Sequence, residues 1–434
     1  MTRPRIVRAV AAAGVAALLV PLLASCSADS TDDASGAAGD AEPAPGVTDT
    51  EIVVGTHHPL SGPAAAGYAS ISAATTAYFA YLNDNGGVNG RTIEYIVKDD
   101  GYNPATTQSV VRELVLEDRV FALLNGLGTA PHSAVLDFLD ENEVPDLFVA
   151  SGSPVFNQPD EHPWTFGFNA DYTAEAKALA TYAQEHFPGK TTCLLAQDDD
   201  LGEDFAAGLV TVLGEDGLAS EQVYTTSNPD VSAQVAAMKQ AGCEVNFLAA
   251  INAFSALAVG TAAKLGYQPQ WLSSSVGGDY GTVSQYLGEN AALLEGFVSA
   301  NYLPSHFSET DEWTTLFRQI NEDYNEGAPF DGNTVYGMSV GYLFAEALAK
   351  AGETPTRQGI VDAVTSGDLR GNGVVPLALS ATNNGAYQGV QVTVVAGGVQ
   401  EYVGTPYTAE PGAGEVTPYT GGPVALEDDG IPSS

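Results

Sequence analysis

Basic residues are scarce in this 434-residue sequence, which has 15 Lys and Arg against 54 Asp and Glu and a formal net charge of −39. A nucleic-acid-binding protein needs clustered cations to displace the counterions of the phosphate backbone, so this class of function is excluded. The few lysines are also scattered, which argues against an anionic membrane surface as the partner of the folded part. So acidic a composition favours a soluble, secreted protein.

Long apolar runs are also missing, except at the N-terminus. Three arginines within the first eight residues precede an uncharged apolar stretch over residues 9–25, which has the layout of a secretory signal and is short for a membrane span. The segment Leu23-Ala24-Ser25-Cys26 resembles the bacterial lipobox, in which the new N-terminal cysteine is lipidated. We expect residues 1–25 to be a lipoprotein signal peptide and Cys26 to carry the lipid. The alternative is an ordinary secretory signal with an incidental cysteine.

Both ends of the remaining chain are poor in large apolar residues. Residues 26–49 are rich in Ser, Asp, Ala, Gly and Pro, and they cannot bury enough surface to order themselves. They predict a flexible tether. From about Gly404 the composition is similar, so we expect residues 404–434 to be a loose extension rich in Pro and Gly.

Between these ends, strands of the buried type alternate with helices. The first strand is expected at residues 51–56 and the first helix at 63–82, and the same rhythm restarts after about Asp171 and runs to a strand at 270–274. Alternating strands and helices predict parallel sheets with crossover helices. We therefore expect an α/β fold with two doubly wound lobes.

The last third of the sequence returns to both lobes. A strand near residues 297–303 is followed by several helices and then by a hairpin, for which Asn384-Gly385 is the strongest turn signal. This order predicts three chain crossings that form a hinge. The expected boundaries are residues 50–168 and 303–372 for lobe 1, and residues 169–302 and 373–403 for lobe 2.

Several short motifs occur in an order and at spacings that are typical of one family. They are PLSGP at residues 59–63, LN and GGVNGR within 82–91, DD at 99–100, VP at 144–145, DDDLG at 198–202, LG at 265–266 and AG at 351–352. Through them the chain from Glu51 to about Gly404 resembles the bacterial periplasmic solute-binding proteins of the leucine/isoleucine/valine-binding family, which serve ABC transporters. The resemblance implies a type I periplasmic-binding-protein fold whose two lobes close around a small solute. The segment PWTFG at 163–167 looks more like relatives with varied or aromatic ligands.

In such a fold the ligand binds beyond the carboxyl ends of the strands. The segment NGLGTAP at residues 125–131 follows the third strand, where the family uses a Ser or Thr for a ligand carboxylate, so the resemblance implies Gly128 and Thr129 as ligand-binding residues. Thr129 also has the position of a helix N-cap, a compatible alternative. Ser151 and Ser153 resemble the family loop that contacts the polar head of the ligand, with ordinary turn formation as the alternative.

The second lobe supplies the remaining candidates. Tyr172 begins a helix just after the first crossing, and Leu201 stands where relatives often carry Tyr or Phe, which weakens the case for an aromatic wall there. The candidates at the ends of later strands, where family members line the pocket, are Asn252, Phe254, Ser274 and Ser275. For Phe254 a place in the core is the favoured alternative.

One departure from the family concerns the charge of the ligand. The branched-chain binders place an acidic residue near the position of Ser275 to hold the ligand's ammonium, but residues 272–277 read LSSSVG. An ammonium without a counter-ion would be costly to desolvate. The ligand is then a carboxylate without an amine, an amide, or an amino acid whose ammonium meets another acid such as Asp171 or Asp279.

The two remaining cysteines are expected to be neighbours. Cys193 opens the first strand of the second lobe and Cys243 opens its third, and these strand starts are adjacent in a 2-1-3 strand order. A disulfide is expected in an exported protein. Two free buried thiols are the alternative.

Catalytic and metal-binding patterns are weak. The segment GMSVG at residues 337–341 fits the hydrolase elbow G-x-S-x-G, but no strand precedes it and no histidine follows it, so Ser339 is interpreted as a helix residue. His57 and His58 are adjacent, and adjacent side chains of a strand point to opposite faces. We therefore expect no metal and no cofactor, with His58 as a further candidate for the cleft.

The combined prediction is a lipid-anchored receptor outside the cytoplasm, not an enzyme. It is expected to be monomeric, to bind a small-molecule ligand and to deliver it to an ABC permease and ATPase complex. The alternatives are a sensing receptor of the same fold without a transporter and, less favoured, a secreted hydrolase.

Overall fold

The computed structural model describes residues 44–62 and 64–433. The expected signal peptide at 1–25, the lipidation site Cys26 and most of the expected tether lie outside the described residues. The last part of the tether is attached to the fold, because Val47 forms a backbone bridge with Ile52. Within the described range, no helix combines the length and the apolar character that a membrane crossing requires.

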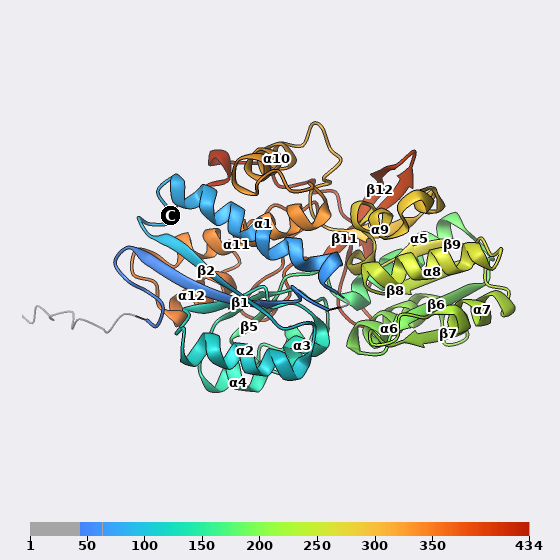
Figure 1. The fold of residues 1–434 in the computed structure, drawn as a ribbon, viewed down its shortest axis with the longest axis horizontal. Helices are drawn as coiled ribbons and strands as arrows, with labels where there is room; N and C mark the ends of the chain where they lie inside the picture. The colour runs from blue at the N-terminus through green and yellow to red at the C-terminus, as the bar shows by residue number, and fades with distance from the viewer. Residues whose placement is uncertain (1–43, 63, 434) are drawn as a thin grey trace, which may run out of the picture. The chain divides into compact units, whose positions relative to one another are not determined.

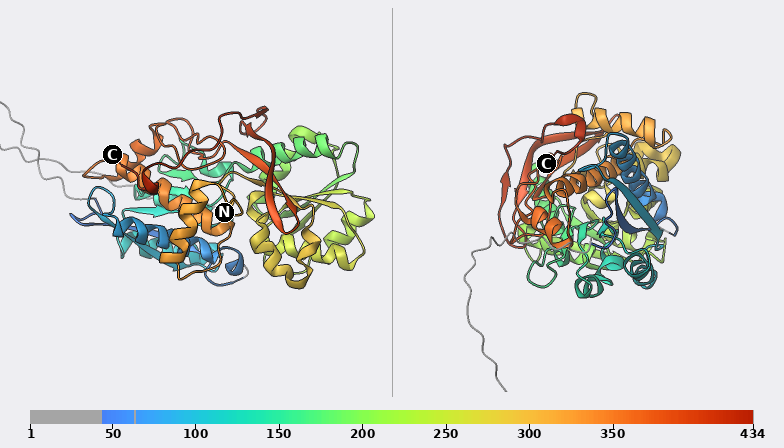
Figure 2. Two further views of the ribbon diagram at one scale, coloured as in Figure 1. Left: turned by 90° about the horizontal axis from the view of Figure 1, so that it is seen from above. Right: turned by 90° about the vertical axis from the view of Figure 1, so that its left-hand side faces the viewer.

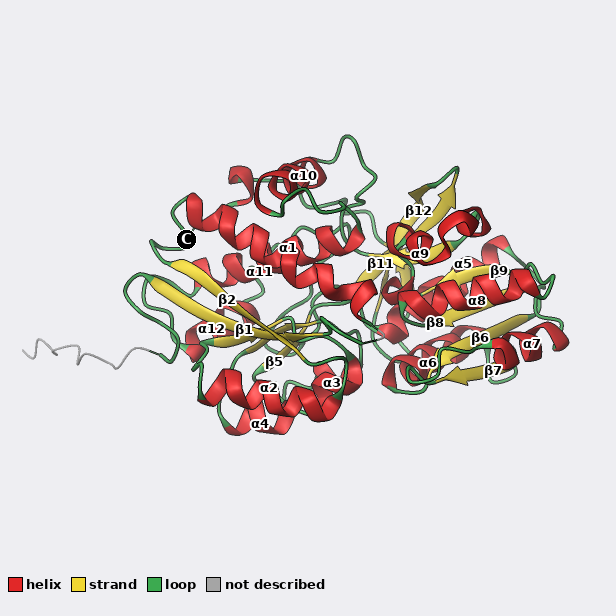
Figure 3. Ribbon diagram, in the orientation of Figure 1, coloured by secondary structure: helices red, strands yellow, loops and turns green. Residues whose placement is uncertain are grey.

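Lobe 1 is built on a parallel sheet. Among the described residues its five strands lie in the order β2 (Thr92–Asp99), β1 (Glu51–His58), β3 (Ala122–Leu124), β4 (Asp146–Val149) and β5 (Thr165–Gly167). Helices cover both faces of this sheet (Figure 1; Figure 3). They are α1 (Ala65–Asp84), α2 (Pro104–Leu116), α3 (Thr129–Ser133), α4 (Leu136–Glu141), α10 (Glu312–Tyr324), α11 (Gly332–Lys350) and α12 (Arg357–Thr365).

Lobe 2 is built on a larger, mixed sheet. Its eight strands in the described range lie in the order β13 (Val416–Pro418), β12 (Val399–Ala409), β11 (Gly389–Ala396), β10 (Val298–Asn301), β9 (Gln270–Ser273), β8 (Val245–Ala249), β6 (Thr192–Gln197) and β7 (Leu218–Tyr224). The strands from β7 to β10 are parallel, and β11, β12 and β13 extend the sheet in antiparallel fashion. The helices are α5 (Tyr172–His186), α6 (Asp200–Leu213), α7 (Ser232–Gln240), α8 (Asn252–Lys264) and α9 (Tyr280–Leu287).

Part of the acidic excess stabilises helix starts. A carboxylate that precedes a helix accepts a backbone N–H of the first turn and interacts favourably with the helix dipole. Aspartates cap α5, α6, α9, α10 and α11 in this way, and they are Asp171, Asp199, Asp279, Asp311 and Asp331. The sequence therefore fixes where many of the helices begin.

The C-terminal hairpin differs from the expectation. Strands β11 and β12 are joined by Gly397-Gly398, whose φ values of 60° and 83° suit the tight two-residue turn of a twisted hairpin. The expected turn at Asn384-Gly385 is wrong. Asn384 instead lies next to β5, where its carbonyl accepts the Gly167 N–H at 2.9 Å. Both dipeptides fit a hairpin turn, and only the alternating strands on each side of Gly397-Gly398 decide between them.

The expected loose extension is also folded. Strand β12 runs to Ala409 and pairs with β13, because valines and tyrosines between the prolines provide strand residues. The chain then returns to lobe 1, where Val424 accepts the Trp313 Nε1–H at 2.9 Å and Gly430 accepts the Tyr78 hydroxyl at 2.6 Å. Residues 410–433, here called the C-terminal strap, thus connect the lobes in addition to the three expected crossings (Figure 2).

Candidate functional site

A cavity of about 110 Å³ lies between the two lobes. It is bordered by segments that follow the carboxyl ends of β3, β4, β8 and β9, as expected for facing parallel sheets. A volume of this size holds a solute of roughly ten non-hydrogen atoms. The arrangement provides a partly enclosed site for a small molecule between the lobes.

Six of the candidates from the sequence line this cavity. Gly128, Thr129, Tyr172, Leu201, Asn252 and Ser275 are all among its walls. They come from both lobes, so the wall is complete only when the lobes are together. Their contact with a ligand stays a prediction.

The other four candidates lie around the cavity without lining it. Ser151 lies behind Thr129, with 2.7 Å between the two hydroxyl oxygens. Ser153 borders a smaller neighbouring cavity and donates to Asp204. Phe254 is a core residue, stacked on Tyr224 with ring centroids 4.0 Å apart. Ser274 is buried at the end of β9.

Thr129 does not cap a helix. It is the first residue of α3, a helix of five residues. The capping position belongs to Gly128, which has no side chain with which to cap the helix. Gly128 has a φ of 104°, and a Cβ at this position would lie 2.5 Å from the ring of Tyr102. Glycine is required here because the loop approaches an aromatic wall closely. The Thr129 hydroxyl is held by Ser151 instead.

Aromatic residues form a large part of the wall that the sequence did not reveal. Tyr68, Tyr102, Tyr302 and Tyr336 line the cavity together with Tyr172. They stand on elements that are far apart in the sequence, so no local pattern connects them. Tyr102 has a φ of 58°, a strained conformation directly beside the cavity.

Two acids provide negative charge at the site. Asp279 lines the cavity, and the carboxylate also caps α9 and accepts the Gly332 N–H at 3.2 Å. Glu175 is fully buried behind Ser275, whose N–H it accepts at 3.1 Å through Oε2. Burial raises the pKa of Glu175 to about 7. Sequence reasoning missed Glu175, because it lies inside α5 and meets Ser275 only through folding.

Several buried polar atoms on the lobe 2 side lack a protein partner in the described structure. They are Glu175 Oε1, Asn252 Oδ1 and the hydroxyls of Ser274 and Ser275. A buried polar atom without a partner costs free energy, so such atoms indicate where a ligand or water binds. Asn252 Oδ1 can only accept a hydrogen bond, and the same holds for Glu175 Oε1 when the carboxyl group is ionised. No Lys or Arg lines the cavity among the residues that the structure describes.

Hydrogen bonds across the cleft show that the lobes are closed. Tyr68 of lobe 1 donates its hydroxyl to the Val276 carbonyl of lobe 2 at 2.8 Å. Ser153 of lobe 1 donates to Asp204 Oδ2 at 2.6 Å. These contacts join the two lobes beside the cavity.

The remaining sequence motifs lie away from the cavity wall. Ser339 is buried within α11 and donates its hydroxyl to the Val335 carbonyl at 2.7 Å, as a helix residue does. His58 is buried and does not line the cavity. No group of three or more His, Cys, Asp or Glu side chains suited to a metal is found in residues 44–62 and 64–433.

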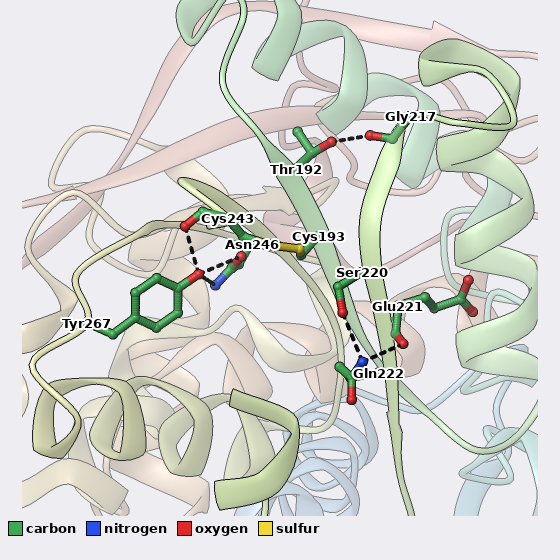
Figure 4. Close-up of a disulfide and its surroundings, with 9 residues drawn as sticks. All are labelled: Thr192, Cys193, Gly217, Ser220, Glu221, Gln222, Cys243, Asn246 and Tyr267. Carbon is green, nitrogen blue, oxygen red and sulfur yellow. Dashed lines mark hydrogen bonds between the residues drawn. A yellow bond between two sulfur atoms is a disulfide. The ribbon is translucent and has the colours of Figure 1, made fainter. Parts of the chain in front are cut away.

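Cys193 and Cys243 are joined by a disulfide, with their Cα atoms 5.9 Å apart (Figure 4). The bond connects the start of β6 to the segment before β8, and these strands are paired in the sheet. It closes a loop with a sequence separation of 50 residues within lobe 2.

Comparisons with known proteins agree with this geometry. Residues 51–399 match the family model described as "Periplasmic binding protein". The chain is 24% identical over 314 residues to the Leu/Ile/Val-binding protein homolog 1 of Brucella abortus, covering 71% of this chain and 81% of that protein. A branched-chain amino acid ABC transporter structure from Thermus thermophilus with bound valine has a TM-score of 0.75 at 20% identity, covering 83% of this chain and 97% of that one.

A solute binding protein of an ABC transporter from Rhodopseudomonas palustris, in complex with 3,4-dihydroxy benzoic acid, has a TM-score of 0.70 at 19% identity, covering 83% of this chain and 97% of that one. At these identities the structural likeness establishes the fold.

Proposed function

Because the chain belongs to the periplasmic binding protein family and has the family's solute-binding fold, we propose that it is the extracytoplasmic substrate-binding component of an ABC importer. It captures a small polar solute between its lobes and presents the closed form to a membrane permease. The observation that carries this proposal is the cavity, which residues of both lobes enclose and cross-cleft hydrogen bonds seal. Ligand binding selects closure because only the closed form offers contacts from both walls.

The polar groups of the cavity favour a ligand that donates hydrogen bonds. Asn252 Oδ1 in the cavity wall and Glu175 Oε1 behind the wall residue Ser275 are buried atoms without a protein partner in the described structure. An ammonium or amide group would satisfy them. An amino acid or an amide therefore fits better than a carboxylate without a nitrogen, and the names of the Brucella and Thermus proteins support the amino acid.

A second ligand class has its own support. Five tyrosines line the cavity, and the Rhodopseudomonas protein holds a dihydroxybenzoate. An aromatic acid would place its ring among these side chains. The two classes differ in their dependence on Glu175, which an ammonium needs in the ionised form and an aromatic acid does not.

Binding is tested by thermal unfolding of residues 27–434 against a panel of amino acids, aliphatic amides and aromatic acids. A ligand at 100 times its dissociation constant stabilises the folded state by about 2.7 kcal/mol, which is readily measured. If no compound of the panel raises the unfolding temperature, the proposed ligand classes are contradicted.

The role of Glu175 is tested by Glu175→Gln. With an amino acid as the ligand, the variant should bind roughly tenfold or more weakly, because a hydrogen bond to a charged group is lost. Wild-type affinity should fall as the pH drops below about 7, where Glu175 takes up a proton. The matched control is Glu346→Gln, a buried glutamate of α11 that accepts two backbone N–H groups from residues outside the cavity wall, whereas Glu175 is bonded to the wall residue Ser275. Equal weakening in both variants would exclude Glu175 from the ligand site.

We further propose that Cys26 anchors the protein to the outer face of the cell membrane. The lipobox resemblance supports this location. Incorporation of labelled palmitate should be lost in Cys26→Ser, and a labelled variant would contradict the anchor.

Transport is preferred to sensing on the family resemblance. Uptake of the identified ligand by cells should disappear when the gene is deleted. Unchanged uptake with a lost transcriptional response would favour the sensing receptor. The hydrolase has no support from Ser339, whose hydroxyl is buried inside a helix.

A further inference from the structure

Four buried side chains of lobe 1 form a hydrogen-bonded chain that solute binding does not explain. Asp100 Oδ2 lies 2.7 Å from His57 Nδ1, and His57 Nε2 lies 2.8 Å from His132 Nδ1. His132 Nε2 in turn lies 2.7 Å from Asp146 Oδ2. All four residues are 1% exposed or less. The chain joins β1, the residue after β2, helix α3 and strand β4.

These three contacts determine the number of protons. Each contact needs one proton between its two atoms, because carboxylates and unprotonated ring nitrogens only accept. The chain therefore holds three protons, one more than two neutral imidazoles supply. With one proton fewer, two lone pairs would face each other between His57 and His132. With one proton more, two N–H groups would face each other, so the contact at 2.8 Å requires the single shared proton.

The surroundings place this shared proton on His132. Burial lowers the pKa of His57, which favours the neutral ring with its Nδ1–H donated to Asp100. His57 Nε2 is then an acceptor, and His132 Nδ1 donates to it.

Few other groups face the pair. Apart from Asp100 and Asp146, the titratable neighbour is His58, whose pKa burial lowers to about 3, so it stays neutral. The hydroxyls of Thr107 and Thr165 donate to the two carboxylates at 2.8 Å and 3.0 Å. These two hydroxyls add no charge of their own.

The imidazole pair is in direct contact with the ligand loop, defined here as residues 126–129. Gly126 covers the pair, since a Cβ there would lie 2.4 Å from His132 Nδ1 and 2.6 Å from His57 Nε2. Gly128 and Thr129 of the same loop line the cavity, and Thr129 begins the short helix that contains His132. On the other side, Asp100 Oδ1 accepts the N–H of Tyr102, another wall residue, at 2.9 Å.

We propose that His57 and His132 are positioning residues whose shared proton holds the ligand loop in its binding conformation. Loss of this proton at raised pH separates the two rings, moves Gly126 and with it Gly128 and Thr129, and weakens ligand binding. The effect on affinity rests on the proposed solute-binding function, whereas the coupling between the proton and the loop does not.

The coupling is tested on the ligand-free, full-length mature chain with ¹⁵N-labelled histidine and backbone amides, by NMR from pH 5 to 9. At low pH, three of the four ring nitrogens of His57 and His132 should be protonated. As the third proton leaves, the amide signals of Gly126 and Thr129 should shift with the same midpoint. Two protonated nitrogens throughout, or a histidine titration that leaves the loop amides unmoved, would overturn the proposal.

A variant isolates the shared proton. In His132→Asn the amide Nδ2 takes the place of Nδ1 and donates to His57 without titrating. The shift of the Thr129 amide with pH should disappear. The control is His162→Asn, a histidine of the same lobe that also pairs with an aspartate, at 2.5 Å from Asp140, and lies outside the cavity wall. A pH response that survives in His132→Asn, or is lost equally in the control, would overturn the proposal, and the wild-type titration stands if the variant does not fold.

Binding of L-valine and of 3,4-dihydroxybenzoate supplies the second readout. The affinity of whichever probe binds should fall roughly fivefold or more as the shared proton is lost. Unchanged affinity across that titration would overturn the positioning role. If neither probe binds while the loop amides follow the histidines, the ligand classes proposed above are wrong and the proton–loop coupling stands.

Discussion

The two lobes treat buried polar groups in opposite ways where they face the ligand cavity. Among the residues that line the cavity, lobe 1 satisfies its polar side chains within the protein: Thr129 bonds to Ser151, and Asn333 donates to the Gly67 carbonyl. In lobe 2 the wall atoms Asn252 Oδ1 and Ser275 Oγ, and Glu175 Oε1 behind Ser275, have no partner in the described structure. At the cavity wall, lobe 1 therefore presents satisfied polar side chains, whereas lobe 2 presents several without a protein partner.

This difference suggests an order of events in binding. A satisfied wall needs no rearrangement and can receive the solute in the open form. The unsatisfied wall gains most from the solute, because its buried acceptors are costly until a donor reaches them. On the proposed function, we therefore expect lobe 2 to supply most of the differential affinity that drives closure.

The lobes also differ in that the disulfide lies within lobe 2. Its removal has the largest expected effect on stability among these predictions. Cys193→Ala combined with Cys243→Ala should destabilise lobe 2 by about 4 kcal/mol, from the chain entropy of a loop of 50 residues. Trp271 lies in lobe 2, whereas Trp164 and Trp313 lie in lobe 1, so tryptophan-to-phenylalanine backgrounds report each lobe separately in urea unfolding.

The lobe 2 midpoint should fall and the lobe 1 midpoint should stay close to its wild-type value. Reduction of the wild-type disulfide serves as the matched control and should reproduce the effect. An equal fall in both lobes would show that they unfold as one unit and that the disulfide does not distinguish them.

The C-terminal strap is the second difference between the lobes. It stabilises lobe 1, although it follows the last strands of lobe 2 in the sequence. Deleting residues 420–434 removes the hydrogen bonds that Val424 and Gly430 accept from Trp313 and Tyr78. The expected loss is roughly 2 kcal/mol, at about 1 kcal/mol for each hydrogen bond, and it should appear in the lobe 1 tryptophan signal.

Deletion of residues 432–434 alone keeps both hydrogen bonds and is the control. Loss of stability confined to lobe 2 would mean that the strap acts through β13 rather than through its return to lobe 1.

The sequence predicts the parallel sheets well because buried strands are continuous apolar runs. The expected strand at 51–56 and helix at 63–82 correspond to β1 (Glu51–His58) and α1 (Ala65–Asp84). The topology then places Thr129, Asn252 and Ser275 at the ends of strands, and the cavity lies there. Local apolar patterns predict the strands and helices, and the rule that ligands bind beyond the carboxyl ends of parallel strands predicts where the cavity lies.

The rest depends on contacts between distant segments. Glu175 is an ordinary helix residue in the sequence, and only the approach of Ser275 gives it a role. Adjacent His57 and His58 carry no sign that His132 will meet one of them. The strap was missed for a different reason: proline-rich composition concealed the residues that pair in β12 and β13.

The smallest expected effect concerns the contact that joins the lobes beside the cavity, between Ser153 and Asp204. Burial raises the pKa of Asp204 to about 6, above its ordinary value of 3.8. The proton is therefore bound more tightly in the closed form, so this group stabilises closure fully below about pH 4, and the contribution is lost as the pH rises through 6. Asp204→Asn accepts the Ser153 hydroxyl without a charge and should close more readily at pH 7.5, by roughly two- to threefold in the closed-to-open ratio.

At pH 4 the variant and the wild type should be alike. Fluorescence energy transfer between labels on the two lobes of the ligand-free protein measures the ratio. Asp216→Asn, at an exposed position of the same lobe beyond the end of α6, is the control and should leave the ratio unchanged, because Asp216 is not among the charges that shift the pKa of Asp204. A ratio in Asp204→Asn that matches the wild type at both pH values would remove this contact from the closing mechanism, leaving the unsatisfied acceptors of lobe 2 as its source.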